Sequence, residues 1–227
     1  MSDNWLTEWS EKKISIAQNL NDGKCGGSYA EAVIILCSVL SGIAADLWPG
    51  KFKDRVRFVE LLISYAEKSL DVKKISIPLL IGELRDSGYK EESEILFKEF
   101  MPSCKTLVIT GDDVDKSIKD IISICPSLPI KLVKENCYAH ILYKEVRSGY
   151  VHEYMPGERS DSWGMGSVRS KDKISYSNRG DKPDRLIYYS VNWLVMLVRS
   201  VVKTIEDSSA SPDDGSFDDW WLKNNET

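Results

Sequence analysis

The sequence predicts a mainly α-helical fold, and three observations support this prediction. Apolar residues recur at helical spacing in most segments of the 227-residue chain. The hydrophobic content of 42 % is sufficient for a buried core. Two neighbouring segments, residues 173–177 and 185–190, are rich in β-formers, and they flank the turn-rich sequence "NRGDKP". We therefore expect a helical bundle that carries one β-hairpin over residues 172–190.

The first helices are predicted from their periodicity and from signals at their ends. Residues 4–20 form a loose helical stripe, which the glycine-rich segment 21–27 interrupts. Ser28 is a predicted N-cap, and Glu31 three residues later completes a capping box. The apolar helix that follows ends at "WPGK", and residues 53–68 carry a second apolar stripe. We expect these two helices to form an antiparallel pair.

The middle of the chain predicts a series of shorter elements. Residues 77–88 and 90–101 each show the pattern of a short helix, whereas residues 104–110 suit a short strand or an extended link. An acid-capped helix is expected over residues 112–125, where the sequence "PSLP" follows it. A long helical pattern then covers residues 131–151.

The C-terminal part differs in character. A loop rich in Gly and Ser at 156–173 leads into the hairpin, and an apolar helix expected in the core follows at 191–206. The end is acidic with little periodicity, which predicts a mobile tail, although Trp220 and Trp221 are unusual there. The predicted organisation is an N-terminal helix with a Gly-rich link (1–27), a helical domain (28–207) and an acidic mobile tail (208–227).

Charge and cysteine content narrow the classes of function. The net charge of −5 argues against a broad basic surface for nucleic acid, but it leaves room for a local basic site. Five cysteines are scattered singly, which is typical of reduced thiols in the cytoplasm. With two histidines and no CxxC pair we expect no metal site, and no motif implies a cofactor. The apolar segments predict core helices rather than a membrane span, and the polar N-terminus is not typical of a signal peptide.

The strongest candidate for chemistry is an Arg–His pair in "YKEVRSGYVHEY", residues 143–154. Arg147 offers a fork of donors for phosphate oxygens, and His152 can move a proton near neutral pH. Together they suit cleavage of RNA by its own 2′-hydroxyl, which needs a base, an acid and positive charge at phosphorus but no metal. On a regular α-helix five residues turn about 500°, so the two side chains would lie about 140° apart. Gly149 between them could kink the helix end, and on a bent helix end the pair could converge on one phosphate. A symmetric dimer would supply a second histidine.

The sequence "KEVRSGYVHEY" resembles the signature of the HEPN superfamily, in which Arg is followed by four to six residues and His near the end of a core helix. The resemblance extends over residues 28–207 and is strongest at 143–154. It implies a helical bundle with extra N-terminal and middle helices and an inserted hairpin before the last core helix. It also implies a metal-independent endoribonuclease of a toxin or antiviral defence system, acting as a homodimer with Arg147 and His152 at the dimer cleft.

Further residues take expected roles from this resemblance or from their chemistry. In HEPN toxins paired with a nucleotidyltransferase antitoxin, the final tyrosine of the motif can be modified by AMP, and this position corresponds to Tyr154. The expected supporting residues are Ser148 for hydrogen bonding, Tyr150 for stacking on a base, Glu153 for orienting the imidazole and Lys144 for contact with RNA. For Tyr150, Glu153 and Lys144, ordinary core or surface positions are the more frequent explanation of such residues.

Two main functions remain open on the sequence. The first is the nuclease, with RNA as substrate and an antitoxin or defence-system protein as a further partner. The second is a non-catalytic HEPN-like module that binds a partner protein or a nucleotide through the bundle, the hairpin or Trp220 and Trp221. A weaker third is an antitoxin or immunity subunit that keeps a relic of the motif. The discriminating observation is whether Arg147 and His152 face each other or lie apart.

Overall fold

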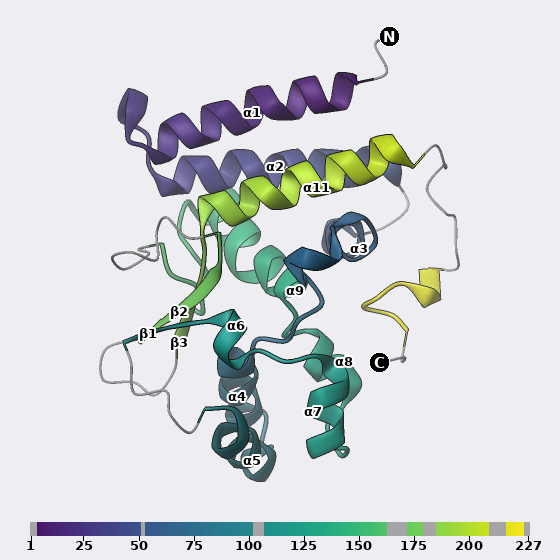
Figure 1. The fold of residues 1–227 in the computed structure, drawn as a ribbon. Helices are drawn as coiled ribbons and strands as arrows, with labels where there is room; N and C mark the ends of the chain where they lie inside the picture. The colour runs from purple at the N-terminus through teal and green to yellow at the C-terminus, as the bar shows by residue number, and fades with distance from the viewer. Residues whose placement is uncertain are drawn as a thin grey trace.

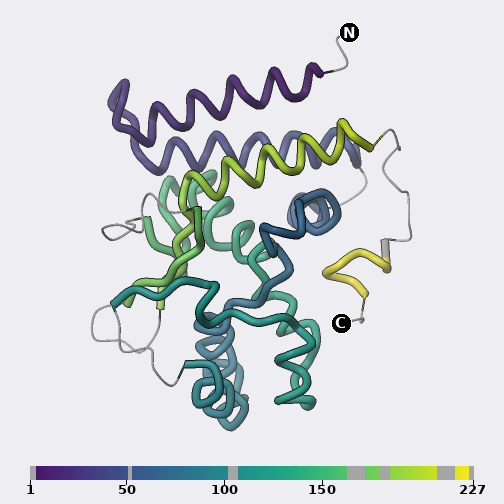
Figure 2. Tube along the Cα trace, viewed as in Figure 1, coloured from purple at the N-terminus to yellow at the C-terminus, as the bar shows by residue number. Residues whose placement is uncertain are grey.

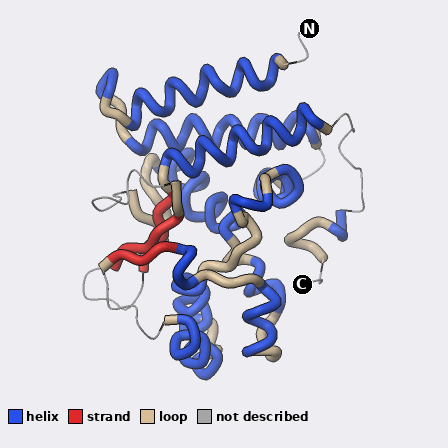
Figure 3. Tube along the Cα trace, viewed as in Figure 1, coloured by secondary structure: helices blue, strands red, loops and turns tan. Residues whose placement is uncertain are grey.

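The computed structural model describes residues 4–50, 53–101, 107–162, 172–178, 185–208 and 217–224. Within these residues the fold is mainly helical, with a small three-stranded antiparallel sheet (Figure 3). This confirms the predicted fold class of a helical bundle with a β-hairpin. The longer helices are α1 (Trp5–Asn21), α2 (Tyr29–Leu47), α3 (Asp54–Tyr65) and α11 (Val191–Asp207).

The shorter elements lie between α3 and α11 in the chain. The predicted helices in the middle of the sequence are observed as α4 (Ile77–Asp86) and α5 (Lys90–Phe100). The next helices are α6 (Gly111–Val114), α7 (Ile118–Ile124) and α8 (Ile130–Lys134). One helix, interrupted by a π turn, follows as α9 (Tyr138–Ile141), η3 (Leu142–Arg147) and α10 (Ser148–Glu153).

The helices α1, α2 and α11 lie side by side at one end of the molecule, and α4, α5, α7 and α8 lie at the other (Figure 1). The first predicted unit, residues 1–27, is therefore not separate from the bundle where it is described. Arg199 of α11 donates two hydrogen bonds to Glu11 of α1, at 2.6 and 2.8 Å. Thr7 donates its hydroxyl to Glu206 at 2.6 Å, so α1 is fixed to α11 at two places.

Helix α2 is the central helix of this end. It begins as predicted, because the Ser28 backbone N–H donates to Glu31 at 2.7 Å and the Ala30 N–H donates to the Ser28 hydroxyl. By length and composition alone it could cross a membrane. In the structure it contacts α1, α3 and α11, which is the position of a core helix.

The sheet has the strand order β1 (Val108–Thr110), β2 (Ile174–Asn178) and β3 (Arg185–Tyr189), all antiparallel. The predicted hairpin is confirmed by the pairing of β2 with β3, while its turn lies outside the described residues. Residues 104–110, expected as a short strand or an extended link, form the strand β1 in their described part. The sheet lies beside the interrupted helix, and the tube in Figure 2 shows how the chain passes from β3 directly into α11.

Two long helices predicted from the sequence are each divided, and one extended segment explains both breaks. Residues 112–125 divide into α6 and α7 because the backbone of Lys116 pairs with Ile75, at 2.8 and 3.3 Å. Residues 131–151 divide after α8 because the N–H of Tyr138 donates to the carbonyl of Lys74 at 3.0 Å. The extended segment between α3 and α4 therefore lies between residues 112–125 and residues 131–151. Its backbone bonds to each of them at the point where the expected helix breaks.

The carboxylate of Asp115 joins the elements around these breaks. Its Oδ1 accepts the backbone N–H of Ile77 at 2.9 Å, at the start of α4. Its Oδ2 accepts the hydroxyls of Tyr176, at 2.5 Å, and of Tyr138. Burial raises the pKa of Asp115 to about 7, and the hydrogen bonds from Tyr138, Tyr176 and Ile77 oppose that rise only in part. One buried acid thus connects α4, α9 and β2.

The described part of the predicted mobile tail, residues 217–224, lies against the bundle. Trp220 is buried, with its ring centroid 4.9 Å from that of Trp48. The backbone N–H of Trp221 donates to Glu60 at 2.9 Å, and the ammonium of Lys134 donates to the carbonyl of Asn224 at 3.1 Å. The acidic composition of this segment suggested that nothing would offset the conformational entropy lost when it docks. Burial of the Trp220 indole provides that stabilisation.

Replacing Asp115 by Asn is expected to flatten the pH dependence of stability. With a pKa of about 7 against the usual 3.8, the folded chain holds one more proton than the unfolded chain between these values. The free energy of unfolding therefore falls as pH rises through this window, by about 4 kcal/mol as an upper bound. Asn has the same shape but does not ionise, so the variant lacks this contribution. Urea unfolding from pH 4.5 to about pH 8 measures the difference.

The matched control is Asp120→Asn. Asp120 is exposed, and its hydrogen bond from Ser117 lowers its pKa. This control is expected to keep the decline in stability between about pH 5 and pH 7. Equal slopes in wild type and Asp115→Asn would contradict the assignment.

Candidate active site

The candidate site lies where the interrupted helix changes its winding. In the π turn η3 the backbone bonds run from residue i to i+5, which widens the helix and leaves backbone groups free for other partners. The carbonyl of Glu145 accepts the N–H of Gly157 at 2.6 Å and the hydroxyl of Ser160 at 3.2 Å. The loop after α10 is therefore held against the helix that carries the Arg–His motif.

Gly149 allows this close approach. A Cβ at this position would lie 2.5 Å from the carbonyl oxygen of Met155 and 2.8 Å from the nitrogen of Gly157. Both are backbone atoms, so they cannot rotate away from an added methyl group. The sequence suggested that Gly149 could kink the helix end, whereas the structure shows that it makes room for the returning chain.

Arg147 is largely buried, with 13 % of its side chain exposed, and it is held by three neighbours. Its Nη2 lies 2.7 Å from Oδ2 of Asp54, the first residue of α3. Its Nε donates to the hydroxyl of Ser41 on α2 at 3.3 Å. The ring of Tyr143 lies beneath the guanidinium, 5.2 Å from its central carbon, and adds a cation–π contact.

These partners leave one edge of the guanidinium facing His152. Nη1 of Arg147 lies 3.5 Å from Nε2 of His152, which is the outer limit of a hydrogen bond. The structure therefore brings the two side chains together, although a regular α-helix would separate them. The wide turn η3 ends at Arg147, and the long arginine side chain reaches forward from it to the exposed His152. An oxygen placed between the two nitrogens could contact both at about 2.8 Å.

The hydroxyl of Tyr143 belongs to the same cluster. It donates to Oδ2 of Asp54 at 3.1 Å, so one carboxylate oxygen serves both Tyr143 and Arg147. Burial raises the pKa of Tyr143, and the neighbouring charge of Asp54 adds to this rise. Tyr143 thus stays a neutral donor that fixes Asp54 beside Arg147.

The helix ends at Tyr154, which has the left-handed backbone conformation with φ 57°. Its side chain is exposed, and its hydroxyl donates to the carboxylate of Glu31 at the start of α2. The hydroxyl proposed for modification is therefore on the surface but contacts a carboxylate. Modification by AMP stays a prediction.

The expected supporting residues lie in different surroundings. Tyr150 is buried, with its ring 5.9 Å from that of Tyr29, so stacking on a base would require this ring to leave the core. Glu153 is exposed on α10, and Ser148 is half-buried next to the hydroxyl of Tyr143. Lys144 is exposed, with its ammonium 3.9 Å from Glu145. All of these roles stay predictions, and Tyr150 has the position of a core residue.

Ser41, Asp54 and Tyr143 are neighbours of Arg147 that the sequence did not single out. Tyr143 precedes Arg147 by four residues, so helical spacing was a signal that could have found it. Ser41 and Asp54 come from α2 and α3, and only the packing of those helices brings them to the motif. No local pattern in the sequence identifies such pairs.

Metal ligands and a reactive cysteine are the other groups that could support chemistry. Among the described residues no group of three or more His, Cys, Asp or Glu is arranged to hold a metal ion. Cys37 is a buried residue of α2. Burial raises the pKa of its thiol to about 12, and the charge of Arg147 opposes this rise only in part. Its thiol stays protonated and is a poor nucleophile.

No protein-family model matches the chain, and comparisons with curated proteins and with solved structures gave no match.

Replacing Gly149 by Ala is expected to destabilise the chain by about 1–3 kcal/mol, because the added methyl group meets backbone atoms of the loop. Thermal unfolding measures the change. The matched control is Gly42→Ala on α2, where a Cβ meets nothing within 4 Å. This control is expected to stabilise the chain by about 0.5–1 kcal/mol, because Ala is a better helix former than Gly. A Gly149→Ala variant as stable as wild type would show that the loop does not need this approach.

Proposed function

We propose that the protein is a metal-independent endoribonuclease that acts as a homodimer. The single observation that supports this most directly is the convergence of Arg147 and His152, with 3.5 Å between Nη1 and Nε2, at an exposed helix end. A cation and an imidazole at this separation can address the same phosphate group. The resemblance of "KEVRSGYVHEY" to the HEPN signature points to the same chemistry.

The reaction requires three things of these side chains. A neutral imidazole takes the proton of the ribose 2′-hydroxyl as its oxygen bonds to phosphorus. The guanidinium of Arg147 stabilises the negative charge that grows on the phosphate oxygens. An imidazolium gives a proton to the 5′-oxygen as the bond between phosphorus and that oxygen breaks. The products are a 2′,3′-cyclic phosphate and a free 5′-hydroxyl.

One histidine cannot serve as base and acid in the same step, so the proposal requires a dimer. His152 of the partner subunit would supply the second imidazole across a two-fold axis. Exposed apolar side chains at the same helix end support a contact there. They are Val151, Tyr154 and Met155, with exposed fractions of 40, 55 and 63 %.

The biological setting rests on the resemblance. It suggests a toxin or an antiviral defence system, with an antitoxin or a defence-system protein as a partner. The proposal places the protein in the cytoplasm, which agrees with free thiols at the four described cysteines. It needs neither a membrane nor a cofactor.

A second candidate is a non-catalytic module, and the ion pair between Arg147 and Asp54 favours it. At 2.7 Å this carboxylate already neutralises the guanidinium that a phosphate would need. A substrate must therefore compete with Asp54 or share the guanidinium with it. In a module that never binds phosphate, the same ion pair would join α3 to the interrupted helix.

Purified wild-type protein is expected to cleave single-stranded RNA in the presence of EDTA and to leave 2′,3′-cyclic phosphate ends. His152→Ala and Arg147→Ala are each expected to lower the rate by about 100-fold or more, because each removes a group that acts in the transition state. Gel electrophoresis and mass spectrometry of the fragments measure the rate and the end groups.

The matched control is Arg199→Ala, which removes another arginine that is paired with a carboxylate, Glu11. This control is expected to cleave at the wild-type rate. If His152→Ala cleaves as fast as wild type, the nuclease proposal fails. A wild-type protein that is monomeric by light scattering while it cleaves RNA would overturn the requirement for a dimer.

Asp54→Asn separates the two candidate functions. Asn keeps a hydrogen bond to Arg147 but removes the charge that competes with phosphate, so a nuclease is expected to bind RNA several-fold more tightly, on the order of 1 kcal/mol. Fluorescence anisotropy with labelled RNA in a His152→Ala background measures binding without cleavage. Asp86→Asn, on an exposed residue at the end of α4, changes net charge equally and serves as the control. If neither wild type nor Asp54→Asn binds RNA, the non-catalytic module is favoured.

A further inference from the structure

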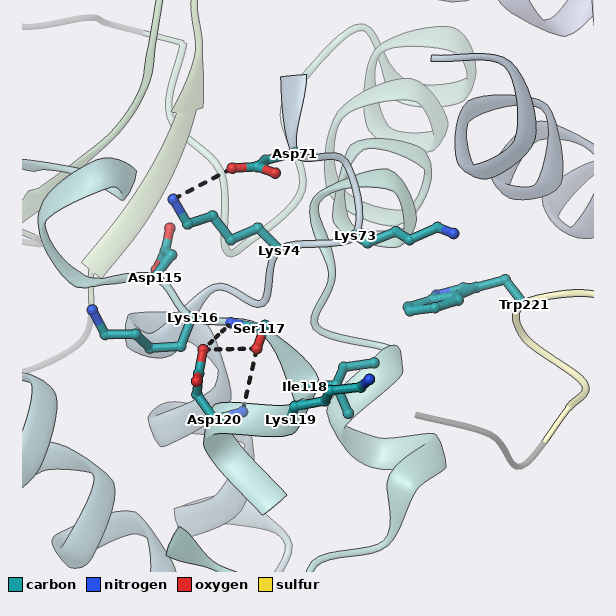
Figure 4. Close-up of a pocket in the computed structure, with 10 residues that line it drawn as sticks. All are labelled: Asp71, Lys73, Lys74, Asp115, Lys116, Ser117, Ile118, Lys119, Asp120 and Trp221. Atoms are coloured by element: carbon teal, nitrogen blue, oxygen red, sulfur yellow. Dashed lines mark hydrogen bonds and ion pairs between the residues drawn. The ribbon is translucent and has the colours of Figure 1, made fainter. Parts of the chain in front are cut away.

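A cavity lies apart from the Arg147–His152 site and shares no residue with it. Its volume is about 490 Å³, which is within the range of small-molecule sites. Its walls come from the segment between α3 and α4, from the segment that joins α6 to α7 with the start of α7, and from the docked C-terminal segment (Figure 4). The lining residues are Asp71, Lys73, Lys74, Asp115, Lys116, Ser117, Ile118, Lys119, Asp120 and Trp221.

The lysines are unusual for a chain whose net charge is −5. Four of the lining residues are lysines, and two of them, Lys73 and Lys119, extend to the side of the cavity where Trp221 lies (Figure 4). The ammonium of Lys73 is 5.4 Å from the centre of the Trp221 ring. Within the described residues neither Lys73 nor Lys119 forms an ion pair with a carboxylate.

Each of the three aspartates of the lining has a partner within the fold. Asp71 faces Lys74 at 3.8 Å, and Asp120 accepts the hydroxyl of Ser117 at 2.7 Å. Asp115 faces inward to its tyrosine partners. The charged groups that the lining presents next to Trp221 are therefore the ammonium groups of Lys73 and Lys119.

Trp221 gives this side an aromatic wall. Its backbone is fixed by the bond to Glu60, and the buried ammonium of Lys134 lies 4.7 Å from its ring centre. The indole is thus held in place, but its side chain remains partly exposed to the cavity. A planar ring stacked there would have its charged end within reach of Lys73. Aromatic side chains are the usual platforms for nucleobases, and lysines bind phosphate as point charges.

We infer that this cavity binds a nucleoside phosphate, with the base against Trp221 and the phosphate between Lys73 and Lys119. The inference is independent of the nuclease proposal, because it concerns binding at a separate cavity. Two sources share the required chemistry, a free nucleotide and the phosphorylated end of an RNA strand.

Titration calorimetry with adenosine 5′-monophosphate tests the site in the full chain. Wild type is expected to bind with a dissociation constant below about 1 mM. Lys73→Gln and Lys119→Gln are each expected to weaken binding about tenfold, because each removes a charged hydrogen bond to phosphate. Lys98→Gln, on an exposed lysine of α5 outside this cavity, is the matched control and is expected to bind as wild type does.

Binding of further ligands tests the base-binding part and the phosphate-binding part of the site independently. Adenosine is expected to bind at least tenfold more weakly than its monophosphate. Trp221→Leu is expected to weaken binding of the monophosphate and to leave binding of inorganic phosphate unchanged, with circular dichroism as the check on folding. Competition by a 5′-phosphorylated RNA, but not by its 5′-hydroxyl form, would identify the strand end as the source. Failure of both RNAs to compete would identify the free nucleotide.

Three results would overturn the inference. The first is the absence of saturable binding of adenosine 5′-monophosphate. The second is equal affinity in wild type, Lys73→Gln and Lys119→Gln. The third is equal affinity for adenosine and its monophosphate. None of these results depends on whether the protein cleaves RNA, so failure here is distinguishable from failure of the nuclease proposal.

Discussion

The hydrogen bonds of Asp115 are the constraint on which much of the fold depends. This buried carboxylate contacts the start of α4, the start of α9 and the strand β2, which are widely separated in sequence. Burying an acid is unfavourable unless donors surround it, and two tyrosine hydroxyls and one backbone N–H supply them. Asp115 lies in the break between α6 and α7, so the hydrogen bonds that attach the hairpin are next to the backbone pairing of Lys116 with Ile75 that divides this helical pattern. The interrupted helix starts at Tyr138, whose hydroxyl joins it to the same carboxylate.

The Arg147 cluster, at the other end of the interrupted helix, also stabilises a charged group that is mostly buried. A guanidinium that is mostly buried needs a counter-charge, and Asp54 provides it while Ser41 and Tyr143 complete the surroundings. The result is a rigid cation whose one open edge faces His152. Such an arrangement is suited to positioning an anion, but the nearby carboxylate reduces the positive charge available. The balance between these two effects decides whether the cluster acts on phosphate or only stabilises the bundle.

The sequence anticipated the candidate site in part. Arg147 and His152 were found because their residue types and spacing form a local motif, and local patterns survive in any fold. Their convergence was expected only for a helix bent near Gly149. In the structure, the long side chain of Arg147 at the end of the π turn Leu142–Arg147 reaches His152. Asp54 and Ser41 could not be found at all, because their relation to Arg147 exists only after α2, α3 and the interrupted helix have packed. The same is true of Trp221 and Lys73, which meet 148 positions apart through docking of the C-terminal segment.

By itself, the sequence determined the mainly helical fold, the capping box at Ser28, the hairpin and the core helix α11. These features depend on periodicity, on end signals and on turn residues, which act over a few neighbouring positions. Tertiary structure alone decided where two helical patterns break and where residues 217–224 dock. The physical reason is that a backbone pairing such as that of Ile75 with Lys116, or a buried contact such as Trp48 with Trp220, gains its energy from distant partners. Local propensity cannot encode a partner that only the folded chain brings near.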